Sequence, residues 1–171
     1  MRPSFWQTLD HLARRLVPVG LSMLLVLLAA VPLTAPDFLR ADPMISVLCV
    51  YYWAVHRPDM MGYVGGFMLG LLEDILMGTP MGVSPLVLLM VQWVIVTQYR
   101  FFVGKPFMAT WWVLGLVALG ALLVKALAVA VLTGYLASPS ALVASYVLTM
   151  LLYPPQGWLF GRAQILLDKE T

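Results

Sequence analysis

The chain has 171 residues, of which 62% are hydrophobic and only 11% are charged, against roughly 45–50% and about 25% in an ordinary soluble domain. Its 10 Lys and Arg residues against 8 Asp and Glu give a formal net charge of +2, which is too weak for a nucleic-acid-binding surface. The single cysteine, Cys49, excludes an intrachain disulfide and a cysteine-based metal cluster, and we expect no metal or cofactor.

Apolar runs of membrane-spanning length fill most of the sequence. A helix needs about 20 apolar residues to cross a hydrocarbon core roughly 30 Å thick. We therefore expect an all-α polytopic membrane protein with a compact bundle of six transmembrane helices over residues 16–162 and no separate soluble domain. The expected spans are residues 16–34, 44–55, 58–77, 83–99, 111–135 and 140 to about 160.

Residues 1–15 precede the first span. Ser4 and Gln7 have the spacing of a helix capping box, and apolar residues then recur at three- and four-residue steps, at Phe5, Leu9, Leu12 and Leu16. This pattern predicts an amphipathic helix along the cytoplasmic membrane surface. The first span lacks an acceptable signal-peptide cleavage site, so we expect it to be retained.

The second span is short. Asp42 and Pro43 are typical of an N-cap and a first helical position, and the apolar run that follows, residues 44–55, is only about 18 Å long at 1.5 Å per residue. We expect it to form a tight hairpin with the third span around residues 56–59. In the last span, we expect the helix to be interrupted at Pro154 and Pro155.

The positions of basic residues predict the orientation. With the N-terminus in the cytoplasm, the outer segments hold only Arg40, and the inner segments hold Arg2, Arg14, Arg15, Arg57, Arg100, Lys105, Arg162 and Lys169. We therefore expect both termini, including a tail over residues 163–171, in the cytoplasm.

Three ionisable residues fall inside predicted spans: Glu73, Asp74 and Lys125. A charge at such a depth is expensive and is a functional-site hypothesis by default. Asp74 and Lys125 lie at similar depths from the outer ends of their spans, so Lys125 can pair with Asp74 or with Glu73. We favour a structural ion pair that joins two helices, and a proton or substrate site is the alternative.

Glycines recur at every fourth position around these carboxylates. A helix-packing or partner-binding stripe would contain Gly62, Gly66, Gly70, Gly78 and Gly82, with Asp74 on the same face. Such a face lets another helix approach closely. Packing within the chain is the favoured interpretation, and docking of a partner's transmembrane helix is the sharper alternative.

Groups that could form a catalytic site are scarce. His11 and His56 are expected at the cytoplasmic surface, so Ser84 near the outer face has no base within reach. Glu73 and Asp74 are adjacent on one helix, about 100° apart, and cannot face each other as an aspartyl dyad. We therefore expect no enzyme.

Three segments resemble the bacterial rod shape-determining protein MreD family. Residues 66–82, with small residues, an aspartate and a glycine-bounded turn, resemble the family's central motif, and residues 52–58 and 152–154 are similar to its preceding and closing elements. The residues that carry the resemblance are Tyr52, Trp53, Pro58, Asp74, Pro80, Tyr153 and Pro154.

This resemblance implies a non-enzymatic, multi-pass subunit of the complex that directs cell-wall synthesis in rod-shaped bacteria, located in the inner membrane. Implied partners are MreC, which binds directly, and MreB, RodA and penicillin-binding protein 2 in the same complex, with membrane lipid around them. Assembly of several copies of the chain stays open. The resemblance also implies a helix arrangement like that of the substrate-binding subunits of vitamin transporters.

Two hypotheses follow. In the first, the chain is a scaffold. The glycine stripe and the outer ends of neighbouring helices hold MreC, and the basic inner loops and the amphipathic N-terminus meet the MreB filament or anionic lipid. In the second, it binds a small ligand or lipid in an outward cavity near Asp74 and the turn over residues 79–82.

Overall fold

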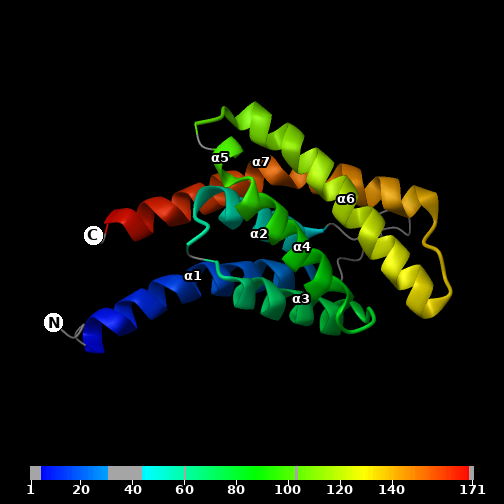
Figure 1. The fold of residues 1–171 in the computed structure, drawn as a ribbon, viewed down its shortest axis with the longest axis horizontal. Coiled ribbons are helices and arrows are strands. Elements are labelled where there is room, and N and C mark those ends of the chain that lie inside the picture. The colour runs from blue at the N-terminus through cyan, green and yellow to red at the C-terminus, as the bar shows by residue number, and fades with distance from the viewer. Residues whose placement is uncertain (1–4, 31–43, 60, 103, 170–171) are drawn as a thin grey trace.

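The computed structural model describes residues 5–30, 44–59, 61–102 and 104–169, and these form helices joined by short connections (Figure 1). The helices are α1 (Phe5–Ala30), α2 (Ile45–His56), α3 (Tyr63–Met77), α4 (Val83–Thr97), α5 (Tyr99–Phe102), α6 (Phe107–Thr133) and α7 (Pro139–Lys169). The beginning of α1 and the end of α7 both lie at the left-hand end of Figure 1. The expected all-helical class is therefore confirmed.

Helix α2 lies at the centre of the bundle and packs against α1, α3, α4, α6 and α7. Every residue from Ser46 to Val55 is buried. The segment has no polar face, so no side of it favours water, and a helix that is apolar all round is buried when other helices can surround it. The short predicted second span is thus the core helix of the fold.

Two antiparallel pairs lie beside α2 (Figure 1): α3 packs against α4, and α6 packs against α7 and α4. Helix α1 packs against α2 and α3. Over the described residues, α6 is the one helix both long and apolar enough to cross a membrane by length and composition, while residues 16–30, α2 and α4 are shorter apolar helices. Large apolar side chains on α6 are exposed, with Leu116 at 73% and Leu127 at 67%. Lipid around the bundle would cover this surface.

Helix α1 differs from the prediction in its continuity. We expected an amphipathic helix over residues 1–15 followed by a separate span, but one helix runs from Phe5 to Ala30 and includes Pro18. The physical reason is that residues 11–17 contain no glycine or proline to break the helix, and Pro18 removes only one backbone hydrogen bond. Ser4, half of the predicted capping box, lies outside the described residues.

The interruption that we expected at Pro154 and Pro155 is wrong, because α7 continues through both prolines to Lys169. Pro154 has no N–H to donate to the carbonyl of Met150 four residues earlier. The indole Nε1 of Trp111 donates to that carbonyl instead, at 3.3 Å. Neighbouring helices can re-satisfy backbone groups that a proline frees, and residues 163–169 are consequently helical.

Two other boundaries differ from the prediction. Helix α2 begins at Ile45 with Met44 at the N-cap position, and the predicted cap residues Asp42 and Pro43 lie outside the described residues. Helix α3 begins at Tyr63, after an extended Gly62, so residues 61 and 62 belong to the connection. The short helix α5 was not predicted.

Candidate functional site: the Asp74 cap and the Lys125 ion pair

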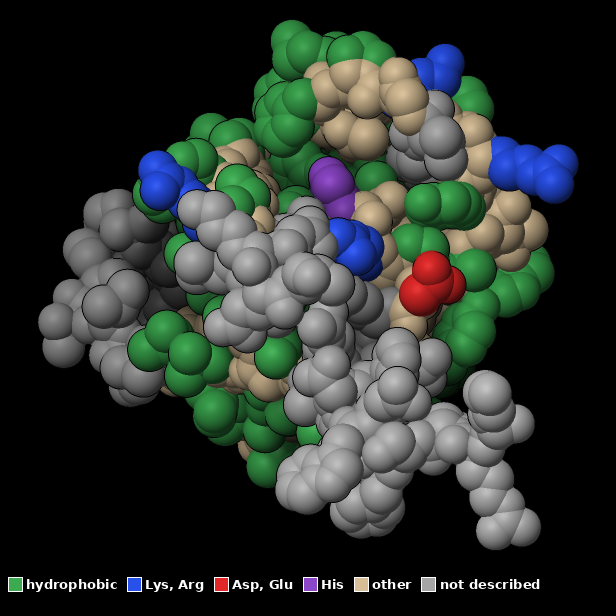
Figure 2. All heavy atoms as spheres, turned by 90° about the vertical axis from the view of Figure 1, so that its left-hand side faces the viewer, with side chains coloured by type: hydrophobic (Ala, Val, Ile, Leu, Met, Phe, Trp, Pro, Cys, Tyr) green, Lys and Arg blue, Asp and Glu red, His purple; other side chains and the backbone are tan. Residues whose placement is uncertain are grey.

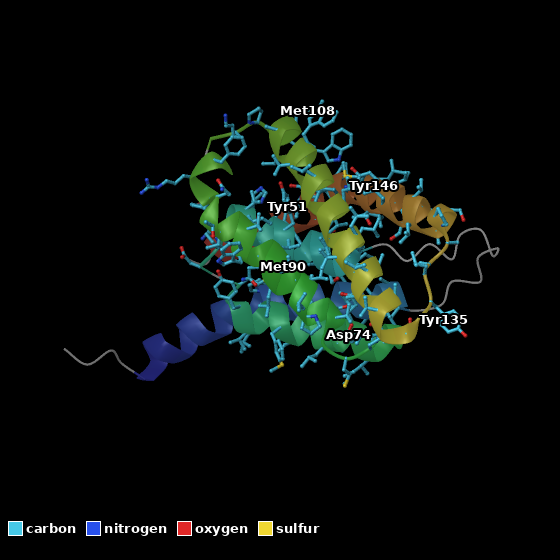
Figure 3. The ribbon with its side chains drawn as sticks, turned by 45° about the vertical axis from the view of Figure 1, so that its right-hand side comes forward. Tyr51, Asp74, Met90, Met108, Tyr135 and Tyr146 are labelled. Atoms are coloured by element: carbon cyan, nitrogen blue, oxygen red, sulfur yellow. The ribbon has the colours of Figure 1, made fainter. Side chains whose placement is uncertain are left out.

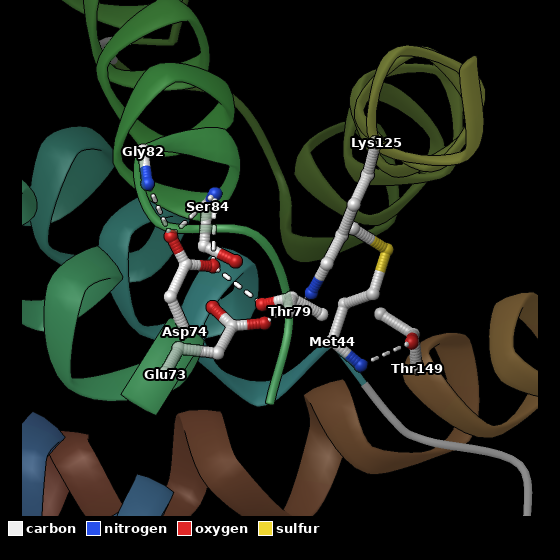
Figure 4. A network of polar contacts seen from close by, with 8 residues as sticks. All are labelled: Met44, Glu73, Asp74, Thr79, Gly82, Ser84, Lys125 and Thr149. Carbon is white, nitrogen blue, oxygen red and sulfur yellow. Dashed lines mark hydrogen bonds and ion pairs between the residues drawn. The ribbon is translucent and has the colours of Figure 1, made fainter. Parts of the chain in front are cut away.

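Asp74, near the end of α3, caps the beginning of α4 (Figure 4). Its carboxylate accepts hydrogen bonds from the Thr79 hydroxyl at 2.6 Å, the Gly82 backbone N–H at 2.8 Å and the Ser84 backbone N–H at 3.2 Å. The side chain is 1% exposed. A helix leaves its first N–H groups without partners inside the helix, and a carboxylate there also interacts favourably with the helix dipole. Asp74 therefore acts as an N-cap supplied from the preceding helix.

The α3–α4 turn brings these donors to Asp74. Gly78 ends α3 with a φ of 66°, and Gly82 precedes α4 with a φ of 102°. Both values lie in the left-handed region, which glycine adopts without steric penalty. Between them, the Pro80 carbonyl accepts a hydrogen bond from the Val83 N–H at 3.3 Å. The two glycines and the carboxylate thus define a single compact turn.

Lys125 reaches from α6 toward α3, and its Nζ forms an ion pair with Oε1 of Glu73 (Figure 4). The sequence left the partner open between Glu73 and Asp74, and the structure places Lys125 on Glu73. Glu73 is 7% exposed and the Lys125 side chain 17%. Since α3 and α6 both pack on α4, the ion pair joins two helices across a third.

A further hydrogen bond lies close to this pair in Figure 4. The Met44 backbone N–H, at the beginning of α2, donates to the Thr149 hydroxyl of α7 at 3.1 Å. The Thr149 hydroxyl itself donates to the Ser145 carbonyl. This end of the bundle therefore joins α2, α3, α4, α6 and α7 through side chains that are buried or nearly so.

The glycine stripe is shorter than predicted and faces the chain itself. A Cβ at Gly70 would lie 2.5 Å from the backbone N and Cα of Pro85, and a Cβ at Gly66 would lie 2.6 Å from Oε1 of Gln92. Both contacts are with α4. Gly62, Gly78 and Gly82 lie outside α3, because the chain turns at these positions. Docking of a partner on Gly66 and Gly70 is therefore wrong for this conformation: α4 occupies that face.

Residues of the resemblance outside the α3–α4 turn lie in the core or in turns. Tyr52 stacks on His56 with ring centroids 4.2 Å apart, and Trp53 contacts Phe160 at 5.3 Å. Tyr153 of α7 contacts the Tyr51 ring edge-on at 5.8 Å. Pro58 lies in the turn after α2, and Pro154 lies within α7. These residues pack helices together and form no polar pocket.

Basic residues mark the opposite end of the molecule, which Figure 2 views face on. Arg57 follows α2, Arg100 is in α5, Lys105 precedes α6, and Arg162 lies late in α7. Lys105 lies over the Phe101 ring at 5.1 Å, and Arg162 lies over the Trp158 ring at 4.9 Å. The side chains of Arg14 and Arg15 lie outside the described part of the chain.

Sequence reasoning missed several polar contacts of the core. Gln92 Nε2 donates to the Met61 carbonyl at 2.6 Å, Tyr51 donates to the Thr110 carbonyl at 2.6 Å, and Tyr146 donates to the Gly115 carbonyl at 3.2 Å. An amide or hydroxyl inside an apolar run was the available signal, since such groups seek a partner when they are buried. Their partners are backbone carbonyls, which no residue pattern identifies.

The described residues offer little for chemistry. Among them, no three His, Cys, Asp or Glu side chains gather as a metal site would require. The Ser84 hydroxyl is buried and has no hydrogen-bond partner among these residues, and His56 lies at the far end of the bundle from it, beside Arg57. The arrangement can hold helices in register, and it brings no nucleophile and base together.

Comparison with known proteins agrees with this picture. The family model described as rod shape-determining protein MreD matches residues 12–162, which is most of the chain. No curated protein and no solved structure matches. The match covers the central α3–α4 motif, the core helix α2 and both prolines of α7. The chain belongs to the MreD family of rod shape-determining proteins, which are non-enzymatic helical membrane proteins.

Proposed function

We propose that this chain is the integral membrane scaffold of the cell-elongation complex, binding MreC and helping to couple MreB filaments to peptidoglycan synthesis by RodA and penicillin-binding protein 2. The observation that carries the proposal is the family match over residues 12–162, which gives the role in determining rod cell shape. The structure supports a stable helical scaffold, because the Asp74 cap, the Glu73–Lys125 ion pair and the Met44–Thr149 hydrogen bond join helices of the chain.

We propose six spans, namely α1, α2, α3, α4, α6 and α7, with both termini in the cytoplasm of a bacterial inner membrane. The positions of the basic residues support this arrangement. The end of the bundle where α1 begins and α7 finishes (Figure 1) carries Arg57, Arg100, Lys105 and Arg162, which lie in connections or near helix termini. Basic residues favour the cytoplasmic side. The opposite turns, residues 78–82 and 134–138, carry no charged residue.

The surface for MreC must lie elsewhere than on the glycine stripe, because α4 covers that stripe. We propose the groove between α4 and α6, a cavity of about 270 Å³. Gly120 lies in it with nothing within 4 Å of an added Cβ, so a partner helix can approach closely there. The groove is lined by Val87, Met90, Val91, Val94, Leu116, Val117, Gly120, Ala121 and Val124.

The test is affinity purification in mild detergent of wild type, Gly120→Leu and Gly20→Leu, with quantification of co-purified MreC. Gly20 on α1 is a matched control, because a Cβ there also meets nothing within 4 Å. We expect the Leu side chain at position 120 to fill the groove and reduce MreC recovery, while Gly20→Leu retains it. Equal recovery with both variants refutes the groove, and no MreC with wild type refutes the partner. Asp74→Ala is unsuitable here, because Asp74 holds the fold.

Binding of a small ligand or lipid is the alternative proposal. The cavity next to Lys125 measures about 150 Å³, below the roughly 300–1,000 Å³ of ordinary ligand pockets. The cavity that includes Gly82 of the 79–82 turn measures about 420 Å³, within that range, but apart from Gly82 its lining is apolar, and the Asp74 oxygens accept internal hydrogen bonds. Thermal stabilisation of the purified protein by lipid-linked wall precursors, lipids or vitamins would support this alternative, and the absence of any shift would count against it.

A further inference from the structure

The helices that carry the Asp74 cap are shorter than the hydrocarbon core of a bilayer. Helices α3 and α4 have 15 residues each, about 22 Å at 1.5 Å per residue, whereas α6 has 27 residues, about 40 Å. The core of a typical bilayer is about 30 Å thick. A long helix such as α6 can tilt to fit a flat bilayer, but a helix of about 22 Å cannot reach both surfaces of a hydrocarbon core about 30 Å thick.

The shortfall lies at the Asp74 end of the molecule. In Figure 1, α6 and the loop after it reach further to the right than the α3–α4 turn. On the left, α3 and α6 begin at a similar level. Figure 3 shows Tyr135, in the loop after α6, pointing away from the bundle and further out than Asp74. The α3–α4 turn is therefore recessed relative to the α6–α7 loop.

The residues of the recessed turn fit a position in hydrocarbon. Residues 78–82 carry no charge, and Met81 at the tip is 71% exposed. The carboxylate of Asp74 accepts from the Gly82 and Ser84 N–H groups, so these two donors at the beginning of α4 need no water. The turn between α2 and α3 at the other end contrasts with it, since that turn contains Arg57 and Asp59.

We propose that the α3–α4 turn lies deeper in the membrane than the α6–α7 loop and is covered by lipid, because the bilayer beside α3 and α4 thins by less than the shortfall in helix length. The surface formed by this hairpin thus fits a specific partner, a lipid layer of reduced thickness, because a short hydrophobic span is accommodated by thinning of the bilayer. The inference goes beyond the scaffold role and rests on the proposed six-span arrangement, in which α3, α4 and α6 each cross the membrane.

Cysteine labelling in nanodiscs tests the depth of the turn. Met81→Cys and Tyr135→Cys each introduce one thiol at a position where the native side chain is exposed to a similar degree, 71% and 81%. The protein itself therefore shields both thiols little, and a difference in their labelling rates reports coverage by lipid. Native Cys49 is fully buried and serves as the blank. Both faces of a nanodisc are accessible, so the result does not depend on the orientation of the chain in cells.

We expect a charged maleimide to label Met81→Cys at least about tenfold more slowly than Tyr135→Cys, because charge is excluded from hydrocarbon. The rate at Met81 should rise in nanodiscs of short-chain phosphatidylcholine and fall in long-chain lipid, with little change at Tyr135. Complete labelling of both variants in denaturing detergent controls for thiol reactivity. If Tyr135→Cys misfolds, Leu136→Cys takes its place, since Leu136 is 83% exposed. Equal rates, or a Met81 rate independent of chain length, would overturn the proposal.

Discussion

Removing the Asp74 carboxylate should destabilise the fold by several kcal/mol. In Asp74→Ala, the N–H groups of Gly82 and Ser84 and the Thr79 hydroxyl lose their acceptor. A buried donor left unsatisfied costs about 1–3 kcal/mol. The Thr79 hydroxyl can rotate to another acceptor, so we expect a total loss of about 3–5 kcal/mol rather than the full sum.

Asp74→Asn separates the cap from any role of the charge. An amide keeps one acceptor oxygen but loses the attraction of a carboxylate to the beginning of α4, about 0.3–2 kcal/mol. We therefore expect Asn to lose about half as much stability as Ala, and Thr79→Val to lose about 1 kcal/mol. Unfolding free energies are measured by SDS titration in mixed micelles with circular dichroism. Wild-type stability of Asp74→Ala would refute the capping argument and favour a proton or ligand role.

Two double-mutant cycles test the other polar contacts. Lys125→Met and Glu73→Gln should each lower the free energy of unfolding by about 3 kcal/mol, because one charge is left without its partner. The double variant should recover much of that loss, and additive losses would contradict the ion pair. Trp111→Phe should lower the free energy of unfolding by about 1 kcal/mol in wild type. In Pro154→Ala the restored N–H can donate to the Met150 carbonyl, so the same substitution should have close to no effect. An equal loss in both backgrounds would show that the indole contact does not compensate for the proline.

The sequence allowed prediction of most helices because their signal is the length of a continuous apolar run, which is a local property. It predicted α4 from residue 83 and placed Lys125 within reach of a carboxylate. It could not predict the continuity of α7, because Pro154 is tolerated only where Trp111, more than 40 positions away, donates to the freed carbonyl. The prediction that Gly62 and Gly78 belong to a packing stripe on one helix was wrong, because the four-residue spacing is the same whether a glycine lies within a helix or at its terminus.

The residues of the α3–α4 turn act as one structural unit when they are placed in space. Gly70 has no side chain, so α3 approaches the backbone of Pro85 at the beginning of α4. One helical turn further along, on the same face, Asp74 is then close enough for its carboxylate to accept from the Gly82 and Ser84 N–H groups. Gly78 and Gly82 supply the positive φ angles that close the turn over this short distance. Each element requires the others: a larger side chain at position 70 would separate the helices and remove the cap, and without the cap the beginning of α4 would leave backbone donors unsatisfied in the membrane.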